Sequence, residues 1–150
     1  MFTDALLQLD AANASIRAAA TYVSTNTIDL SVNRDIGSGE PLKILFNVDV
    51  AFTGGTSVQP QIITSASANL SSPTIIDTAT AILEAALVLG AMFVRFMPEL
   101  IGVSGIGTLG QRYLGVQYIG VGTHTLGSIS ARLVKDVQDV KFYGSGYTII

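Results

Sequence analysis

The chain has no cysteine and no tryptophan, one histidine, and few charged residues among its 150 positions. Without cysteine it can form no disulfide framework, thiolate metal site or thiol nucleophile. Charged residues make up 13% of the sequence, about half of the usual share. Because hydrophobic residues reach 49%, the composition predicts a folded domain rather than a disordered chain. A surface poor in lysine and glutamate favours a protein that contacts other proteins.

Clustered basic residues and long apolar segments are also missing. The eight lysine and arginine residues are scattered and the net charge is −3, so we expect no nucleic-acid partner. The most apolar stretch, Ala85–Val94, is about half as long as a bilayer-spanning helix. Asp4 and Asp10 interrupt the pattern of a secretory signal peptide. These features predict no membrane partner.

Alternating apolar and polar residues predict strands along most of the chain. In the clearest case, Leu42–Phe52, the residues Phe46, Val48, Val50 and Phe52 fall on one face. Two further segments alternate in the same way. Leu114, Val116 and Tyr118 fall on one face of the first, and Ile129, Ala131 and Leu133 are expected to point inward in the second. The predicted strands are Thr21–Leu30, Leu42–Phe52, Ser57–Ser67, Pro73–Thr78, Arg112–Val121 and Ser128–Val137.

Glycine and proline suggest where these strands end. Gly54-Gly55 and the segment Gly122–Gly127 predict turns. Pro60 predicts that its strand lies near a sheet edge, because proline cannot donate to a ladder.

Three segments fit no single element. Residues 1–20 fit an N-terminal arm or a weak helix, and residues 138–150 form a C-terminal tail with aromatic side chains. Ala79–Leu89 has helix propensity, but we favour a strand from about residue 86.

The pattern as a whole lacks alternation of strands and helices. Seven or eight strands joined by glycine-rich segments therefore predict one all-β domain over residues 1–150. Its expected architecture is an antiparallel β-sandwich with jelly-roll topology.

No motif in the sequence predicts catalysis. Gly105–Gly110 matches the dinucleotide pattern G-x-G-x-x-G, but the next segment alternates as a strand and Ser130 stands where an acidic residue is expected. His124, in a predicted turn, is expected to be exposed, and no G-x-S-x-G motif presents a serine to it. Asp136 and Asp139 lack the spacing of a calcium loop. We therefore expect no enzyme activity, metal ion or cofactor.

Three stretches resemble the small capsid cement, or decoration, proteins of tailed bacteriophages. They are the opening Met1-Phe-Thr-Asp-Ala-Leu-Leu-Gln-Leu9, the strand Gln111–Tyr118 and the close Leu133–Ile149, of which the last is the most specific. Residues 53–110 resemble the family only in pattern, and Leu83–Met97 is unusually apolar for it.

The resemblance implies a jelly-roll sandwich that assembles as a homotrimer on the outer surface of a phage head. Such a protein is made in the bacterial cytoplasm, becomes part of the virion and clamps neighbouring major capsid subunits. We expect its contacts in the two terminal segments. The candidate interface residues are Phe2, Leu6, Leu9, Phe142, Tyr143 and Tyr147.

Two other classes of function remain open. A carbohydrate- or receptor-binding jelly-roll module would present aromatic side chains along a groove, and the lack of tryptophan counts against it. A hydrolase or cupin-like metalloprotein would need more than one histidine.

Overall fold

The computed structural model describes residues 5–15, 20–30, 42–97 and 111–135. These residues form an all-β fold in which every strand pair is antiparallel, so the predicted class is confirmed. The elements are η1 (Ala5–Leu7), β1 (Gln8–Ser15), β2 (Thr21–Val23), β3 (Ile28–Asp29), β4 (Lys43–Ser65), β5 (Thr74–Thr78), β6 (Ile82–Leu83), η2 (Glu84–Ala86), β7 (Met92–Phe96) and β8 (Tyr113–Val134).

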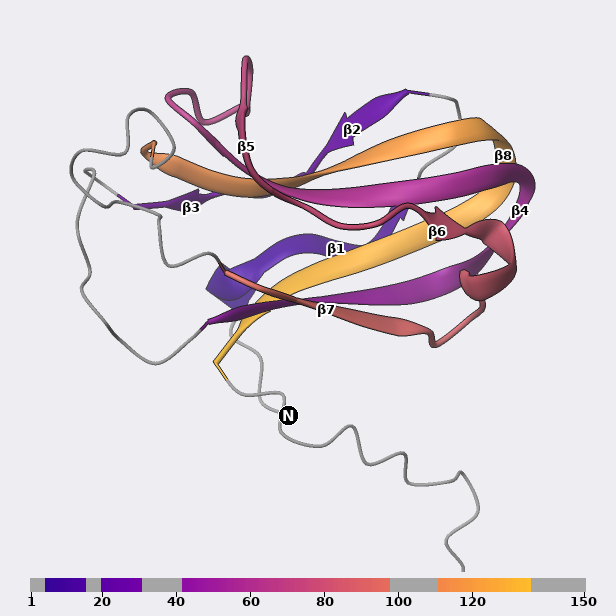
Figure 1. The fold of residues 1–150 in the computed structure, drawn as a ribbon. Helices are drawn as coiled ribbons and strands as arrows, with labels where there is room; N and C mark the ends of the chain where they lie inside the picture. Colours follow the sequence, from indigo (N-terminus) through magenta and orange to yellow (C-terminus); the bar gives the residue numbers. More distant parts are fainter. Residues whose placement is uncertain (1–4, 16–19, 31–41, 98–110, 136–150) are drawn as a thin grey trace, which may run out of the picture.

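Two long strands, β4 and β8, form the centre of the sheet. They have 23 and 22 residues and pair from Lys43 opposite Val134 to Ser65 opposite Tyr113. Both bend near the middle, where the register shifts between Val48 and Ser57. As Figure 1 shows, each strand therefore runs through both layers of the fold.

The curled sheet forms a β-sandwich. One layer contains residues 128–134 of β8 and residues 43–50 of β4. There β1 flanks the β8 half and β7 flanks the β4 half. In the other, β2 and β3 pair with residues 113–119 of β8, and β5 and β6 pair with residues 57–64 of β4. The strand order is β1-β8-β4-β7 in the first layer and β2/β3-β8-β4-β5/β6 in the second. Both orders are compatible with a jelly roll, and the jelly-roll topology stays a prediction.

The glycines at the bend do not end the strands as predicted. Gly54 and Gly122 have φ values of +88° and +82°, which glycine adopts without a side-chain clash, and the ladder continues past both. The expected turns at residues 54–55 and 122–127 are therefore wrong. Glycine here bends two continuous strands, as it does in bulges and sheet corners.

The core between the layers follows the predicted alternation. The inward positions of β8 and most of those of β4 are buried; they are Phe46, Val48, Phe52, Leu114, Val116, Tyr118, Ile129, Ala131 and Leu133. Val50 is the exception, with 38% of its surface exposed. It lies at the bend, where the register shift breaks the alternation.

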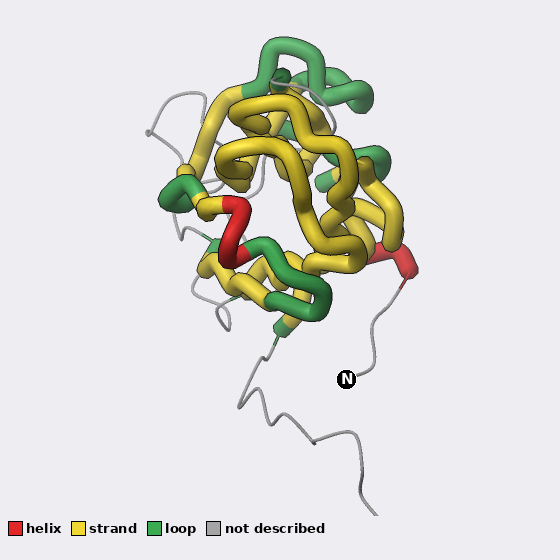
Figure 2. Tube along the Cα trace, turned by 90° about the vertical axis from the view of Figure 1, so that its right-hand side faces the viewer, coloured by secondary structure: helices red, strands yellow, loops and turns green. Residues whose placement is uncertain are grey.

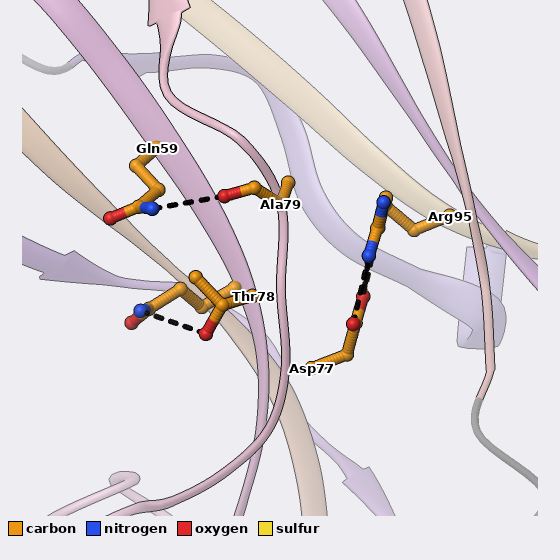
Figure 3. Close-up of polar contacts among 6 residues, drawn as sticks. Gln59, Asp77, Thr78, Ala79 and Arg95 are labelled. Atoms are coloured by element: carbon orange, nitrogen blue, oxygen red, sulfur yellow. Dashed lines mark hydrogen bonds and ion pairs between the residues drawn. The ribbon is translucent and has the colours of Figure 1, made fainter.

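Pro60 lies in the interior of the sheet, so its predicted edge position is wrong. It stands opposite Tyr118 on one side, and its carbonyl accepts the Ala79 N–H (3.0 Å) on the other. A strand residue directs its N–H and C=O to the same side, so the missing donor of Pro60 faces the gap between β5 and β6. Gln59 donates its side-chain amide to the Ala79 carbonyl (3.0 Å) beside this gap (Figure 3).

Two ambiguous segments take forms that local propensity did not predict. Residues 8–15, expected as an arm or weak helix, form β1, because Leu9 is fully buried in the core and pairing with β8 outweighs the propensity of alanine. Residues 82–86 form β6 and η2, and β7 begins at Met92 rather than near residue 86. The predicted C-terminal tail, 138–150, lies outside the described residues.

Polar side chains join the two layers at both open sides of the sandwich. On one side Arg95 of β7 makes two hydrogen bonds of 2.8 Å to Asp77 of β5 (Figure 3). On the other, Asp10 of β1 accepts hydrogen bonds from the Thr25 N–H (2.8 Å) and the Tyr118 hydroxyl (2.7 Å). Burial raises the pKa of the Asp10 carboxyl, and these hydrogen bonds partly offset that rise. Burial also raises the pKa of the Tyr118 hydroxyl well above its ordinary value.

The raised pKa of Asp10 predicts a pH-dependent contribution to stability. When the pKa of a carboxyl is higher in the folded than in the unfolded state, the carboxyl stabilises the fold most at a pH below its unfolded-state pKa, which is about 3.9. This contribution is lost as the pH rises through the folded-state pKa. Asp10→Asn cannot ionise. Urea unfolding of both proteins from pH 3.5 to 7.5 should show that the wild type loses stability relative to the variant as the pH rises. A difference independent of pH would contradict the assignment.

Candidate interaction surface

The carboxylates in the described ranges are all engaged in hydrogen bonds within the chain. Their partners are side chains or backbone N–H groups of the same chain, and apart from Asn47, which lies in β4 with Asp49, they belong to other segments, so these groups have structural roles. Beyond Asp10 and Asp77, the pairs are Asp29 with Arg112 (2.9 Å), Asp49 with Asn47 (2.7 Å) and Glu84 with the backbone N–H groups of Gly54 and Gly55.

The described residues contain no group of three histidine or acidic side chains that could hold a metal ion. In the same ranges no helix is long and apolar enough to span a membrane.

The end of the sandwich at which β4 and β8 bend exposes many apolar side chains. Figure 2 looks onto this end, with both bends toward the viewer and η2 beside them. We call six residues here the bend patch: Val50 (38% exposed), Leu83 (64%), Val88 (55%), Leu89 (70%), Val121 (46%) and Leu126 (49%). Exposed apolar groups gathered at one place mark interaction sites more often than single exposed side chains do.

Backbone pairing brings the members of the bend patch together. Leu83 and Val121 stand opposite Ser57 from its two sides, so these three residues form one row across the sheet. Residues 87–91 run along β4 beside Val50, because Phe52 donates to the Leu87 carbonyl (3.0 Å) and Gly90 to the Val48 carbonyl (2.8 Å). Leu126 stands opposite Thr53 on the other side of β4.

The bend patch is also almost free of charge. The segments 50–76 and 113–131 contain no aspartate, glutamate, lysine or arginine. Glu84 is the one charged residue from 78 to 94, and its carboxylate accepts two backbone hydrogen bonds. Because charged residues are depleted at the centres of protein interfaces, this composition is typical of a protein-binding surface.

His124 lies beneath this surface rather than in an exposed turn, so that expectation is wrong. It is 2% exposed, and its ring packs edge to face against Phe52 with centroids 5.1 Å apart. A Cβ at Gly55 would lie 2.1 Å from the imidazole, so the ring fits only because residue 55 is glycine. His124 Nδ1 is 3.4 Å from Glu84 Oε2, and neither ring nitrogen makes a hydrogen bond to the described residues.

The structure describes two of the six predicted interface residues. Leu6 is 82% exposed, which suits a contact residue, but Leu9 is fully buried in the core and is not available to a partner. Phe2, Phe142, Tyr143 and Tyr147 lie outside the described residues, as do the 105–110 glycine motif, Asp136 and Asp139.

Sequence reasoning missed the bend patch, although one signal pointed to it. The stretch Leu83–Met97, which is unusually apolar, contains Leu83, Val88 and Leu89 of the patch.

One comparison with known proteins identifies a family. The family model Bbp16 matches residues 12–133, which include every described strand except part of β1 and the last residue of β8. No curated protein matches the chain. Because the family match covers most of the 150 residues, including both strands of the bend, the chain belongs to the Bbp16 family.

Proposed function

We propose that this protein is a non-enzymatic structural protein of a phage virion. It binds the outer surface of the capsid and stabilises it by clamping neighbouring major capsid subunits. It acts as a homotrimer, without a cofactor, nucleic acid or membrane as partner. The observation that carries the proposal is the bend patch, an exposed apolar surface almost without charge.

The chemistry of this surface suits lasting contact with another protein. Apolar area removed from water contributes about 25 cal/mol per Å², so six exposed aliphatic side chains offer a substantial driving force. The carboxylate nearest to them already accepts two hydrogen bonds within the chain, so a partner need not desolvate a free charge.

Two further points support a phage head as the partner. The resemblance of the opening and closing stretches to capsid cement proteins supports the class of partner. A β-sandwich also has edge strands, and an assembly covers such edges by pairing or packing against them.

Binding to the assembled shell alone would stabilise that shell by mass action, and many copies on a symmetric lattice would add avidity. We therefore expect purified heads that carry the protein to melt at a higher temperature than heads that lack it, in differential scanning calorimetry. Equal melting temperatures would contradict the cement function. Specific retention on a glycan array, together with equal melting, would favour a carbohydrate-binding module.

The oligomeric state can be measured separately. Light scattering on the purified protein should give the mass of a trimer of the 15.7 kDa chain. A stable monomer at micromolar concentration would contradict the trimer.

A further inference from the structure

The bend of β4 contains two consecutive backbone N–H groups that bind one carboxylate. Gly54, with φ +88°, and Gly55 both donate to Glu84, and the Gly54 nitrogen lies 3.0 Å from Oε1. Successive N–H groups that converge in this way form an anion-binding nest. The nest is filled by a side chain of the same chain, from η2.

The carboxylate lies where three elements meet. Glu84 belongs to η2, the two glycines to β4, and His124, whose Nδ1 is 3.4 Å from Oε2, to β8. His124 is fully covered there and lies against the face of Gly55 that has no room for a Cβ. Glu84 itself keeps 27% of its side chain exposed, so it lies at the rim of the bend patch rather than in the core.

The segments before and after Glu84 also pair with β4. Before Glu84, β6 pairs with β4 through two residues only. After it, Leu87 is fully buried and residues 87–91 make three backbone hydrogen bonds to β4. Between these two paired segments, η2 has no buried residue, and the Glu84 carboxylate is the side chain that bonds it to β4. Leu83 directly precedes η2, and Val88 and Leu89 follow it along the chain.

We propose that Glu84 is a positioning residue for the bend patch. Its carboxylate acts as a latch that holds η2 against the bend of β4. It thereby sets the positions of Leu83, Val88 and Leu89 relative to the two β8 residues of the patch, Val121 and Leu126. What the patch binds rests on the proposed function, but the latch itself does not. A surface fixed before binding loses less conformational freedom when a partner docks, and this raises affinity.

The latch requires a carboxylate. Each oxygen of Glu84 accepts one N–H, whereas glutamine would offer one oxygen and turn its NH₂ group toward the second N–H. Glu84→Gln therefore keeps the shape of the side chain and breaks one of the two bonds. Asp77→Asn is the matched control, because it removes the same charge from a carboxylate that bonds Arg95 on an open side of the sandwich.

The test uses the full chain. In Glu84→Gln, amide hydrogen exchange at Gly54 and Gly55 should be at least tenfold faster than in the wild type, and the methyl NMR signals of Leu83, Val88 and Leu89 should shift. Asp77→Asn should leave both unchanged. Exchange unchanged in Glu84→Gln would overturn the latch, and faster exchange without methyl shifts would overturn the positioning role.

Heads lacking the protein provide a second, separate measurement. Binding of Glu84→Gln to them should be about tenfold weaker than that of the wild type or Asp77→Asn, and equal binding would overturn the positioning role. A wild-type protein that fails to bind heads would overturn the proposed function, and the exchange and methyl results would still decide on the latch.

Discussion

Replacing Gly55 with alanine is expected to destabilise the folded chain by about 3 kcal/mol, at the upper end of the usual cost of overpacking. The added Cβ would lie 2.1 Å from His124 Nδ1 and Cε1. The ring cannot move away easily, because it is buried and packs against Phe52. Urea unfolding at neutral pH measures the change, and thermal unfolding should show a midpoint lower by roughly 6–12 °C.

Two further variants separate the clash from other effects of alanine. In a His124→Ala background the space is open, so Gly55→Ala should then cost much less, with a coupling energy above about 1 kcal/mol. Gly90→Ala is the backbone control. Its φ is +80° but nothing lies within 4 Å of a Cβ there, so we expect a cost of about 1 kcal/mol. If Gly55→Ala costs no more than Gly90→Ala, the packing of His124 on Gly55 is not as described.

Placing aspartate at Leu83 and Leu89 together is expected to weaken binding to phage heads by roughly 100-fold. The two carboxylates would have to leave water in the middle of an apolar contact, a cost typical of the strongest interface positions. Both side chains are mostly exposed, 64% and 70%, so the stability of the free protein should change by no more than about 0.5 kcal/mol per site. Co-sedimentation with heads that lack the protein gives the affinity, and urea unfolding checks the fold.

Ile75→Asp serves as the matched control for this variant. Ile75 is also exposed, at 46%, but it belongs to β5 and pairs with Ile63, away from the bend. We expect it to bind heads as the wild type does. If the double variant binds as tightly as Ile75→Asp, the bend patch is not the contact surface.

The sequence predicted the parts of the fold that depend on local alternation. Strands in which one face is buried repeat every second residue, so the two faces of 112–121 and the inner face of 128–137 could be separated from the pattern. The set Leu114, Val116 and Tyr118 and the set Ile129, Ala131 and Leu133 are both buried. The absence of helix–strand alternation likewise predicted the all-β class, which the structure confirms.

The sequence could not predict what depends on pairing between distant residues. Gly54-Gly55 carries the same local signal whether the chain turns back or bends and continues, and only pairing with residues 122–126 decides the outcome. Pro60 is tolerated inside the sheet because of a gap between two strands that begin later in the chain, at Thr74 and Ile82. His124 is buried because residue 55, far away in sequence, has no side chain.

The candidate site was the least predictable part. The interface was expected at the two termini, yet Leu9 belongs to the core, and the exposed apolar surface is built from four separate segments. Such a patch has no period in the sequence. It arises because two strands bend at the same place and a loop of η2 and residues 87–91 packs beside them.

The most direct test of the central claim is a cryo-electron microscopy reconstruction of heads assembled with this protein. We expect trimeric density on the outer surface, over the junctions between major capsid subunits, with the bend of β4 and β8 facing the shell or a neighbouring copy. Heads without such density, or density in which the bend patch faces solvent, would contradict it.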